Sequence, residues 1–263
     1  MAAKGSSSLH EGKGAYRAPR MNRTNDGIES AIGARAHDEH PLLGSPRRDV
    51  VTTILLTAST VLLFVLMATP ARDSIQRLDQ AFLDRMLSIR SQPLTSVAKF
   101  LNLLGLVVVT FPVRLFVAVF LALRRRWWHL AAFVSAVVLS ELSIGSLKAV
   151  YDRARPPGSL VAVTGGSFPS GHAVAASVTA VAAGIALFPE GGRRYWWGVV
   201  AVFFSMMMGL SRAYLAAHWL SDAVAGVLLG TSFALISAVV VHLIRTRREA
   251  EPSAGRAEGG ERP

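Results

Sequence analysis

The chain contains no cysteine, so it can form neither a disulfide framework nor a thiolate metal site. Charged residues are also scarce, at 17% of the 263 positions, whereas apolar residues make up 51%. A polypeptide with so much apolar and so little charged surface is typical of a membrane protein.

The apolar residues gather in long uncharged runs, and each run approaches the ~20 residues that cross a hydrocarbon core. Four such runs cover residues 50–68, 171–189, 195–211 and 223–244. Two more carry internal charge: residues 101–123 contain Arg114, and residues 128–149 contain Glu141 and Lys148. The pattern predicts an all-α, polytopic membrane bundle of about six transmembrane helices.

The two ends of the chain lack apolar periodicity. Residues 1–49 are rich in Gly, Ser, Ala and mixed charge, and the segment 245–263 is similar. We expect both to be disordered cytoplasmic tails flanking a membrane domain at 50–244. The run at 50–68 is longer than the apolar region of a signal peptide, so we expect it to remain as an anchor.

The distribution of Lys and Arg predicts the orientation in the membrane. Eighteen lie on the side that holds both termini, and nine lie on the other side. Positively charged loops stay in the cytoplasm, so both termini should be cytoplasmic. The net charge of +11 comes from Lys and Arg residues that flank the apolar runs and do not gather on one soluble face. This distribution favours anionic lipid over nucleic acid as a partner.

Between the first two spans, an apolar stripe recurs at gaps of three and four residues. The stripe consists of Ile75, Leu78, Phe82, Met86 and Ile89. It predicts an amphipathic helix that lies on the outer membrane surface or caps the bundle. Neither position gives this helix a catalytic role.

Three polar clusters stand at the edges of the apolar runs. They read K-x6-RP from Lys148 to Pro156, PSGH at 169–172, and SR-x5-H-x3-D from Ser211 to Asp222. All fall on the extracytoplasmic side of the predicted topology, as a single composite site requires. Two guanidinium groups and one ammonium are suited to clamp a phosphate.

Local geometry supports an anion site. Ser170, Gly171 and His172 directly precede an apolar run, so they should form the first turn of a helix whose free N–H groups face an anion. His218 and Asp222 are four residues apart and share one helix face. The carboxylate can then hold the imidazole in one tautomer and leave the other nitrogen free to attack.

Together the clusters resemble the three motifs of the type 2 phosphatidic acid phosphatase family, which is related to the vanadium haloperoxidases. The resemblance covers roughly residues 100–235. It implies that His218 is the nucleophile that forms a phosphohistidine, that Asp222 orients it, and that His172 is the general acid and base. The phosphate ligands it implies are Lys148, Arg155, Ser170, Gly171 and Arg212.

We therefore expect an integral membrane phosphatase that acts on a lipid phosphate at the extracytoplasmic face. The resemblance implies candidates such as phosphatidic acid, phosphatidylglycerol phosphate or a polyprenyl diphosphate. No other cluster of His, Asp and Glu has metal-ligand spacing, so we predict no metal and no cofactor. Three alternatives are a lipid phosphotransferase, a vanadate-dependent oxidoreductase, which the membrane spans disfavour, and a nonenzymatic scaffold.

Two charges fall inside predicted spans. Arg114 and Glu141 come at similar depths when counted from the short turn between their spans, so we expect the pair to lock those spans together. Glu141 could instead support Lys148, seven residues further along the helix. Tyr151, Asp152 and Arg153 stand at the margin of the predicted site.

Overall fold

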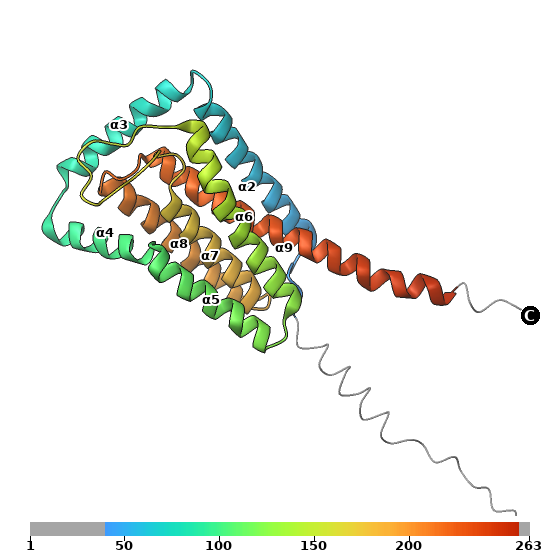
Figure 1. Ribbon diagram of the computed structural model, residues 1–263. Coiled ribbons are helices and arrows are strands. Elements are labelled where there is room, and N and C mark those ends of the chain that lie inside the picture. The colour runs from blue at the N-terminus through green and yellow to red at the C-terminus, as the bar shows by residue number, and fades with distance from the viewer. Residues whose placement is uncertain (1–39, 258–263) are drawn as a thin grey trace, which may run out of the picture. The chain divides into compact units, whose positions relative to one another are not determined.

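The computed structural model describes residues 40–257, which form helices joined by loops. The helices are α2 (Pro46–Met67), α3 (Arg72–Ser88), α4 (Gln92–Leu104), α5 (Val107–Leu123), α6 (Trp127–Tyr151), α7 (Gly171–Leu187), α8 (Gly192–Tyr214) and α9 (Leu220–Ala257). Figure 1 shows α3 and α4 across one end of the bundle, beside the loop that joins α6 to α7. The all-helical architecture confirms the predicted fold class.

Four of the helices in the described part are long and apolar enough to cross a bilayer: α2, α6, α8 and α9 up to Ala250. The pair α4 and α5 makes a fifth if it counts as one span bent by 49°. Helix α7 is apolar but has 17 residues, or about 26 Å at 1.5 Å per residue. The number six therefore stays a prediction.

The predicted span 101–123 is broken in the structure. Helix α4 ends at Leu104, Gly105 and Leu106 form the break, and α5 begins at Val107. A glycine at this position is a poor helix former, and the bend lets α4 turn across the end of the bundle. Helix α4 therefore contacts α8, where its Asn102 bonds to Arg212 of the third cluster.

Close packing of α7 against α9 depends on two glycines. A Cβ atom at Gly226 would lie 2.6 Å from the carbonyl oxygen of Ser170, and one at Gly230 would lie 2.2 Å from Ser177 Oγ. Small residues of this kind let the backbones of membrane helices approach closely. This contact fixes the start of α7, which carries the second cluster, against the start of α9, which carries the end of the third.

Arg114 pairs with Glu141, as expected. Arg114 Nη1 donates to Glu141 Oε1 at 2.6 Å, and Arg114 Nε donates to Thr179 Oγ1 at 2.8 Å. The pair joins α5 to α6, and the second bond joins α5 to α7. Lys148 has a different partner, since its Nζ donates to the carbonyl of Gly166 at 2.9 Å. The alternative pairing of Glu141 with Lys148 is thus not the one formed.

The segment before the first span is more ordered than its composition indicates. Residues 1–39 lie outside the described residues, but within the tail predicted at 1–49, Leu42 and Leu43 are buried at 1% and 3% exposure. They pack among α6, α7 and α9, and α2 already begins at Pro46. Two apolar residues are too few to produce a periodic signal, so composition alone misplaced the boundary.

At the other end, α9 continues beyond the predicted boundary at residue 244. The helix extends to Ala257, and Arg245 Nε forms an ion pair with Glu249 Oε1 at 2.8 Å. A pair at this spacing supports an exposed helix by about 0.3–0.5 kcal/mol. Residues 245–257, predicted as tail, are therefore helical.

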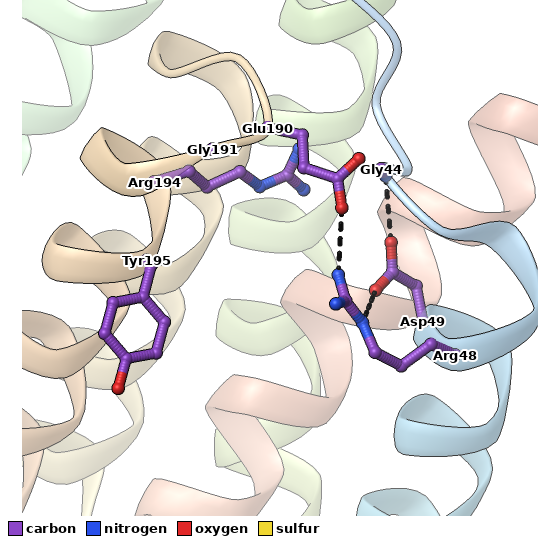
Figure 2. A pocket seen from close by; sticks show the side chains of 7 residues that line it. All are labelled: Gly44, Arg48, Asp49, Glu190, Gly191, Arg194 and Tyr195. Carbon is purple, nitrogen blue, oxygen red and sulfur yellow. Dashed lines mark hydrogen bonds and ion pairs between the residues drawn. The ribbon is translucent and has the colours of Figure 1, made fainter.

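A pocket of about 300 Å³ lies at the end of the bundle opposite the polar clusters, where α2 begins and α7 turns into α8. Figure 2 shows the side chains that line it. Arg48 lies 3.0 Å from the carboxylate of Glu190 and 3.5 Å from that of Asp49. Asp49 also accepts the backbone N–H of Gly44 at 3.0 Å. Arg48 thus attaches the first turn of α2 to the α7–α8 turn, and Asp49 holds the segment before α2 against that same turn of α2.

Candidate active site

The three polar clusters meet where α6 ends, α7 begins, α8 ends and α9 begins. Helix α6 ends because Asp152 adopts a left-handed backbone with φ of 32°. The segment 152–170 then returns the chain to the start of α7, and Ser167 N donates to the carbonyl of Arg153 at 2.8 Å within it. This loop places carbonyl groups next to the side chains of the first cluster.

Arg155 spans the gap between the loop and the third cluster. Its guanidinium donates to the carbonyls of Thr164, Gly165 and Gly166 at 2.7–3.1 Å. On the other side, Arg155 Nη1 donates to the carbonyl of Ala217 at 2.7 Å and lies 3.2 Å from His218 Nε2. A planar fork of five donors is what allows one side chain to hold both segments.

His218 is buried at 3% exposure, and its ring orientation is fixed by a backbone carbonyl. Its Nδ1 lies 2.7 Å from the carbonyl oxygen of Ser167. A carbonyl only accepts, so Nδ1 carries the proton and Nε2 of the neutral ring carries a lone pair. That lone pair accepts a hydrogen bond from Arg155 Nη1 at 3.2 Å.

The expected role of Asp222 as the main partner of this ring needs correction. Asp222 Oδ2 is 3.6 Å from His218 Nδ1, beyond hydrogen-bond distance, while the carbonyl of Ser167 is closer. Spacing along a helix could not reveal a carbonyl 51 residues away in sequence. Asp222 therefore acts on His218 by its charge, and Ser167 sets the tautomer.

Burial lowers the pKa of His218 from 6.5 to about 4. The carboxylate of Asp222 raises this pKa, whereas the positive charges of Arg212 and Arg155 lower it. Loss of water is the largest contribution because the charged imidazolium is the form that loses solvation. The ring is consequently neutral, and able to attack, at physiological pH.

Asp222 is held by groups other than His218. Its Oδ1 accepts a hydrogen bond from Arg153 Nη1 at 2.6 Å, and its Oδ2 accepts the backbone N–H of Trp219 at 2.8 Å. Asp222 stands in the first turn of α9, where an acidic side chain that bonds back to the preceding backbone is stabilising. Arg153, placed at the margin by sequence, is in fact in direct contact with the third cluster.

The expectation that the Ser170 N–H faces an anion is wrong. Ser170 N donates to the carbonyl of Asp222 at 3.0 Å, and this bond joins the second cluster to the third. The hydroxyl of Ser170, in contrast, is fully buried and has no hydrogen-bond partner among the described residues. Its Oγ, together with the N–H groups of the first turn from Gly171 onward, is available to a ligand.

Arg212 reaches the site from the end of α8. It is buried at 2% exposure, and its Nη1 donates to Asn102 Oδ1 in a short hydrogen bond. Its Nε is buried without a partner in the part of the chain that the structure describes. Asn102 belongs to α4, so this bond attaches the overlying helix to the site. No local pattern marks Asn102 in the sequence.

His172 packs against the α4–α5 break. A Cβ atom at Gly105 would lie 2.4 Å from Cδ2 of the His172 ring, so glycine leaves the space that the ring occupies. The Nε2 atom of His172 is buried and has no partner among the described side chains and backbone groups. A ring nitrogen kept unpaired in this way can exchange a proton with a bound molecule.

The site as a whole is suited to an anion. Arg155 bonds to the third cluster and to the loop before the second, and Ser170 N bonds to the carbonyl of Asp222, so the clusters share one space. Buried cations and unpaired donors in that space favour a group with several negative oxygens. Phosphate has this character, and the lone pair at His218 Nε2 adds a nucleophile.

Comparison with known proteins agrees with this chemistry. The sequence profile of the PAP2 superfamily matches residues 129–246, a segment that contains all three clusters. An undecaprenyl-diphosphatase from Sulfolobus acidocaldarius is 31% identical over 152 residues, which are 55% of this chain and 69% of that protein.

Two crystal structures are similar in fold. The PAP2-type phosphatidylglycerolphosphate phosphatase from Bacillus subtilis has a TM-score of 0.62 at 23% identity, with 74% of this chain and 96% of that chain covered. LpxE from Aquifex aeolicus has a TM-score of 0.52 at 22% identity, with coverage of 61% and 94%. The conserved fold, the matched profile and the related diphosphatase lead to one conclusion: this chain is a membrane protein of the PAP2 superfamily.

Proposed function

We propose that the protein hydrolyses a lipid diphosphate or phosphomonoester through a phosphohistidine formed on His218. Membership of the PAP2 superfamily makes it a phosphatase that acts on lipid phosphates. The observation that carries the proposed mechanism is the lone pair of His218 Nε2, fixed by the Ser167 carbonyl and aimed into a cationic site. The relative at 31% identity favours a polyprenyl diphosphate as the substrate.

In the first step, His218 Nε2 attacks phosphorus in line with the leaving oxygen. A P–N bond forms, the P–O bond to the leaving group breaks, and His172 gives that oxygen a proton. The negative charge of the bound phosphate favours the imidazolium form of His172 that this step needs. Lys148, Arg155 and Arg212 stabilise the charge that collects on the equatorial oxygens.

In the second step, neutral His172 accepts a proton from water as the water oxygen attacks phosphorus. The P–N bond breaks, inorganic phosphate leaves, and His218 returns to its neutral form. Asp222, 3.6 Å from His218 Nδ1, stabilises the positive charge that the ring carries while the phosphoryl group is attached. Ser170 Oγ and the first-turn N–H groups of α7 hold the phosphate during both steps.

An apolar groove next to the site supports an amphiphilic substrate. Helices α5, α7 and α8 enclose about 430 Å³ of it. On α7 the groove follows the helix face of His172 through Ala176, Ala180, Ala183 and Leu187. It extends about 22 Å from His172 at 1.5 Å per residue, and small side chains keep it open. A lipid chain in this groove would leave its phosphate at His172.

The same proposal places the site at the extracytoplasmic face and both termini in the cytoplasm. The support is the excess of eighteen Lys and Arg over nine on the two sides of the bundle. A site open to the headgroup layer would receive its substrate from the outer leaflet.

Phosphate release by the purified protein tests the proposed function. In detergent with EDTA, wild type should release phosphate from a polyprenyl diphosphate, and His218→Ala should lower kcat by at least about 10³-fold because the nucleophile is lost. His242→Ala, which changes a histidine on α9 outside the site, is the matched control. Retention of activity by folded His218→Ala would contradict the mechanism, and phosphoryl transfer to an added lipid alcohol without phosphate release would identify a phosphotransferase.

The groove predicts a chain-length effect. Ala180→Phe should lower kcat/KM about tenfold or more for a long polyprenyl diphosphate, since each buried CH₂ contributes about 0.8 kcal/mol. For isopentenyl diphosphate, which is too short to use the groove, kcat/KM should stay unchanged. Ala118→Phe, in the separate apolar groove between α5 and α6, is the control. A chain-length effect confined to Ala118→Phe would place the lipid chain between α5 and α6 instead.

The lowered pKa of His218 predicts that its imidazole ring stays neutral at a pH where an exposed histidine is protonated. Burial lowers this pKa to about 4, so the unfolded chain binds the proton and the folded protein does not between pH 6.5 and about 4. Folding stability should therefore fall over that window as the pH drops. Nitrogen NMR of histidine-labelled protein, assigned with His218→Ala, should show His218 neutral at pH 5; a midpoint near 6.5 would contradict the burial argument.

A further inference from the structure

We propose that Asp79 of α3 is a positioning residue for the phosphatase reaction, which acts through Arg153 on the carboxylate of Asp222. The inference rests on the proposed role of His218. It assigns a part in positioning the site to the amphipathic helix, for which neither position expected from the sequence gave a catalytic role.

Asp79 is part of a buried chain of charges. It is 2% exposed on the face of α3 that packs on the bundle, while Leu78 beside it is 70% exposed. Arg153 Nη2 donates to Asp79 Oδ2 at 2.7 Å, and Arg153 Nη1 donates to Asp222 Oδ1 at 2.6 Å. One guanidinium thus joins a carboxylate on α3 to the carboxylate that faces His218.

Asp79 also completes the first turn of α9. Its Oδ1 accepts the backbone N–H of Ser221 at 2.8 Å, and its Oδ2 accepts the hydroxyl of Ser221 at 2.6 Å. A helix start normally receives such a bond from its own N-cap side chain, but Trp219 has no acceptor to offer. Asp79 supplies it from another helix, and so fixes the turn that carries Asp222.

The sharing of Arg153 between two carboxylates matters for His218. With the Asp79 carboxylate beside it, the positive charge of Arg153 is divided between two partners, and Asp222 keeps negative charge to stabilise the imidazolium of the phosphohistidine. Without that carboxylate, Arg153 pairs with Asp222 alone and weakens the stabilisation. Buried pairs are sensitive to the loss of one partner because little solvent is present to compensate.

The test is Asp79→Asn, which keeps an oxygen for the Ser221 N–H but removes the charge next to Arg153. We expect kcat to fall at least about tenfold with KM nearly unchanged, because the charge that develops on His218 is less stabilised while the groups that bind phosphate are intact. The midpoint of His218 titration should move to lower pH, because its imidazolium is less stabilised. Asp84→Asn, on the exposed side of the same helix, should leave kcat and the titration as in wild type.

Ser221→Ala separates the effect of Asp79 on Asp222 through Arg153 from the bonds by which Asp79 holds the first turn of α9. It removes the hydroxyl that bonds to Asp79 and Arg153 but leaves both carboxylates around the guanidinium. Positioning predicts that this variant loses thermal stability while the His218 midpoint stays as in wild type. Wild-type kcat in Asp79→Asn, or a lowered kcat with no change in the His218 midpoint, would overturn the proposal.

If Asp79→Asn does not fold, Asp79→Glu is measured instead. It keeps the charge and moves it by one methylene, so positioning predicts a kcat below wild type, and an unchanged kcat would overturn it. His218→Ala distinguishes the two proposals. Full activity of His218→Ala would refute the phosphohistidine. An inactive His218→Ala together with a fully active Asp79→Asn would refute only the role of Asp79.

Discussion

The close contact of α7 with α9 is the constraint on which the site depends. Gly226 and Gly230 allow the two helices to approach until Ser170 N reaches the carbonyl of Asp222 at 3.0 Å. This hydrogen bond brings the turn of α7 that we propose binds phosphate next to His218, the proposed nucleophile, which precedes α9. A side chain at either glycine would separate the second cluster from the third.

Much of this site could be predicted from the sequence because its residues follow local patterns. Apolar runs marked the helices, and the cations and histidines that end them marked the clusters. Arg114 and Glu141 could be paired from their depths alone, and the structure confirms that contact at 2.6 Å. The break at Gly105 was missed, since one glycine inside an apolar run is no clear helix end, and the separate helix α4 was missed with it.

The remaining parts depend on contacts between distant segments. Ser167 sets the tautomer of His218 through a carbonyl group, which every residue has, so no side-chain pattern announces it. Asn102 and Asp79 are ordinary polar residues in their own helices, and only the packing of α4 and α3 over the bundle brings them to Arg212 and Arg153. Helices α3 and α4 therefore each hold an arginine of the site in place. These two helices, which lie across one end of the bundle, are part of the site.

The central claim, covalent catalysis by His218, is tested most directly by trapping the intermediate. Brief incubation of the wild-type protein with a polyprenyl diphosphate that carries a labelled terminal phosphate, stopped in alkaline denaturant, should leave the label on the protein. Covalent catalysis predicts an acid-labile, base-stable phosphoryl group located on His218 by mass spectrometry and absent from His218→Ala. Label on another residue, or steady phosphate release with no labelled protein at any time, would contradict it.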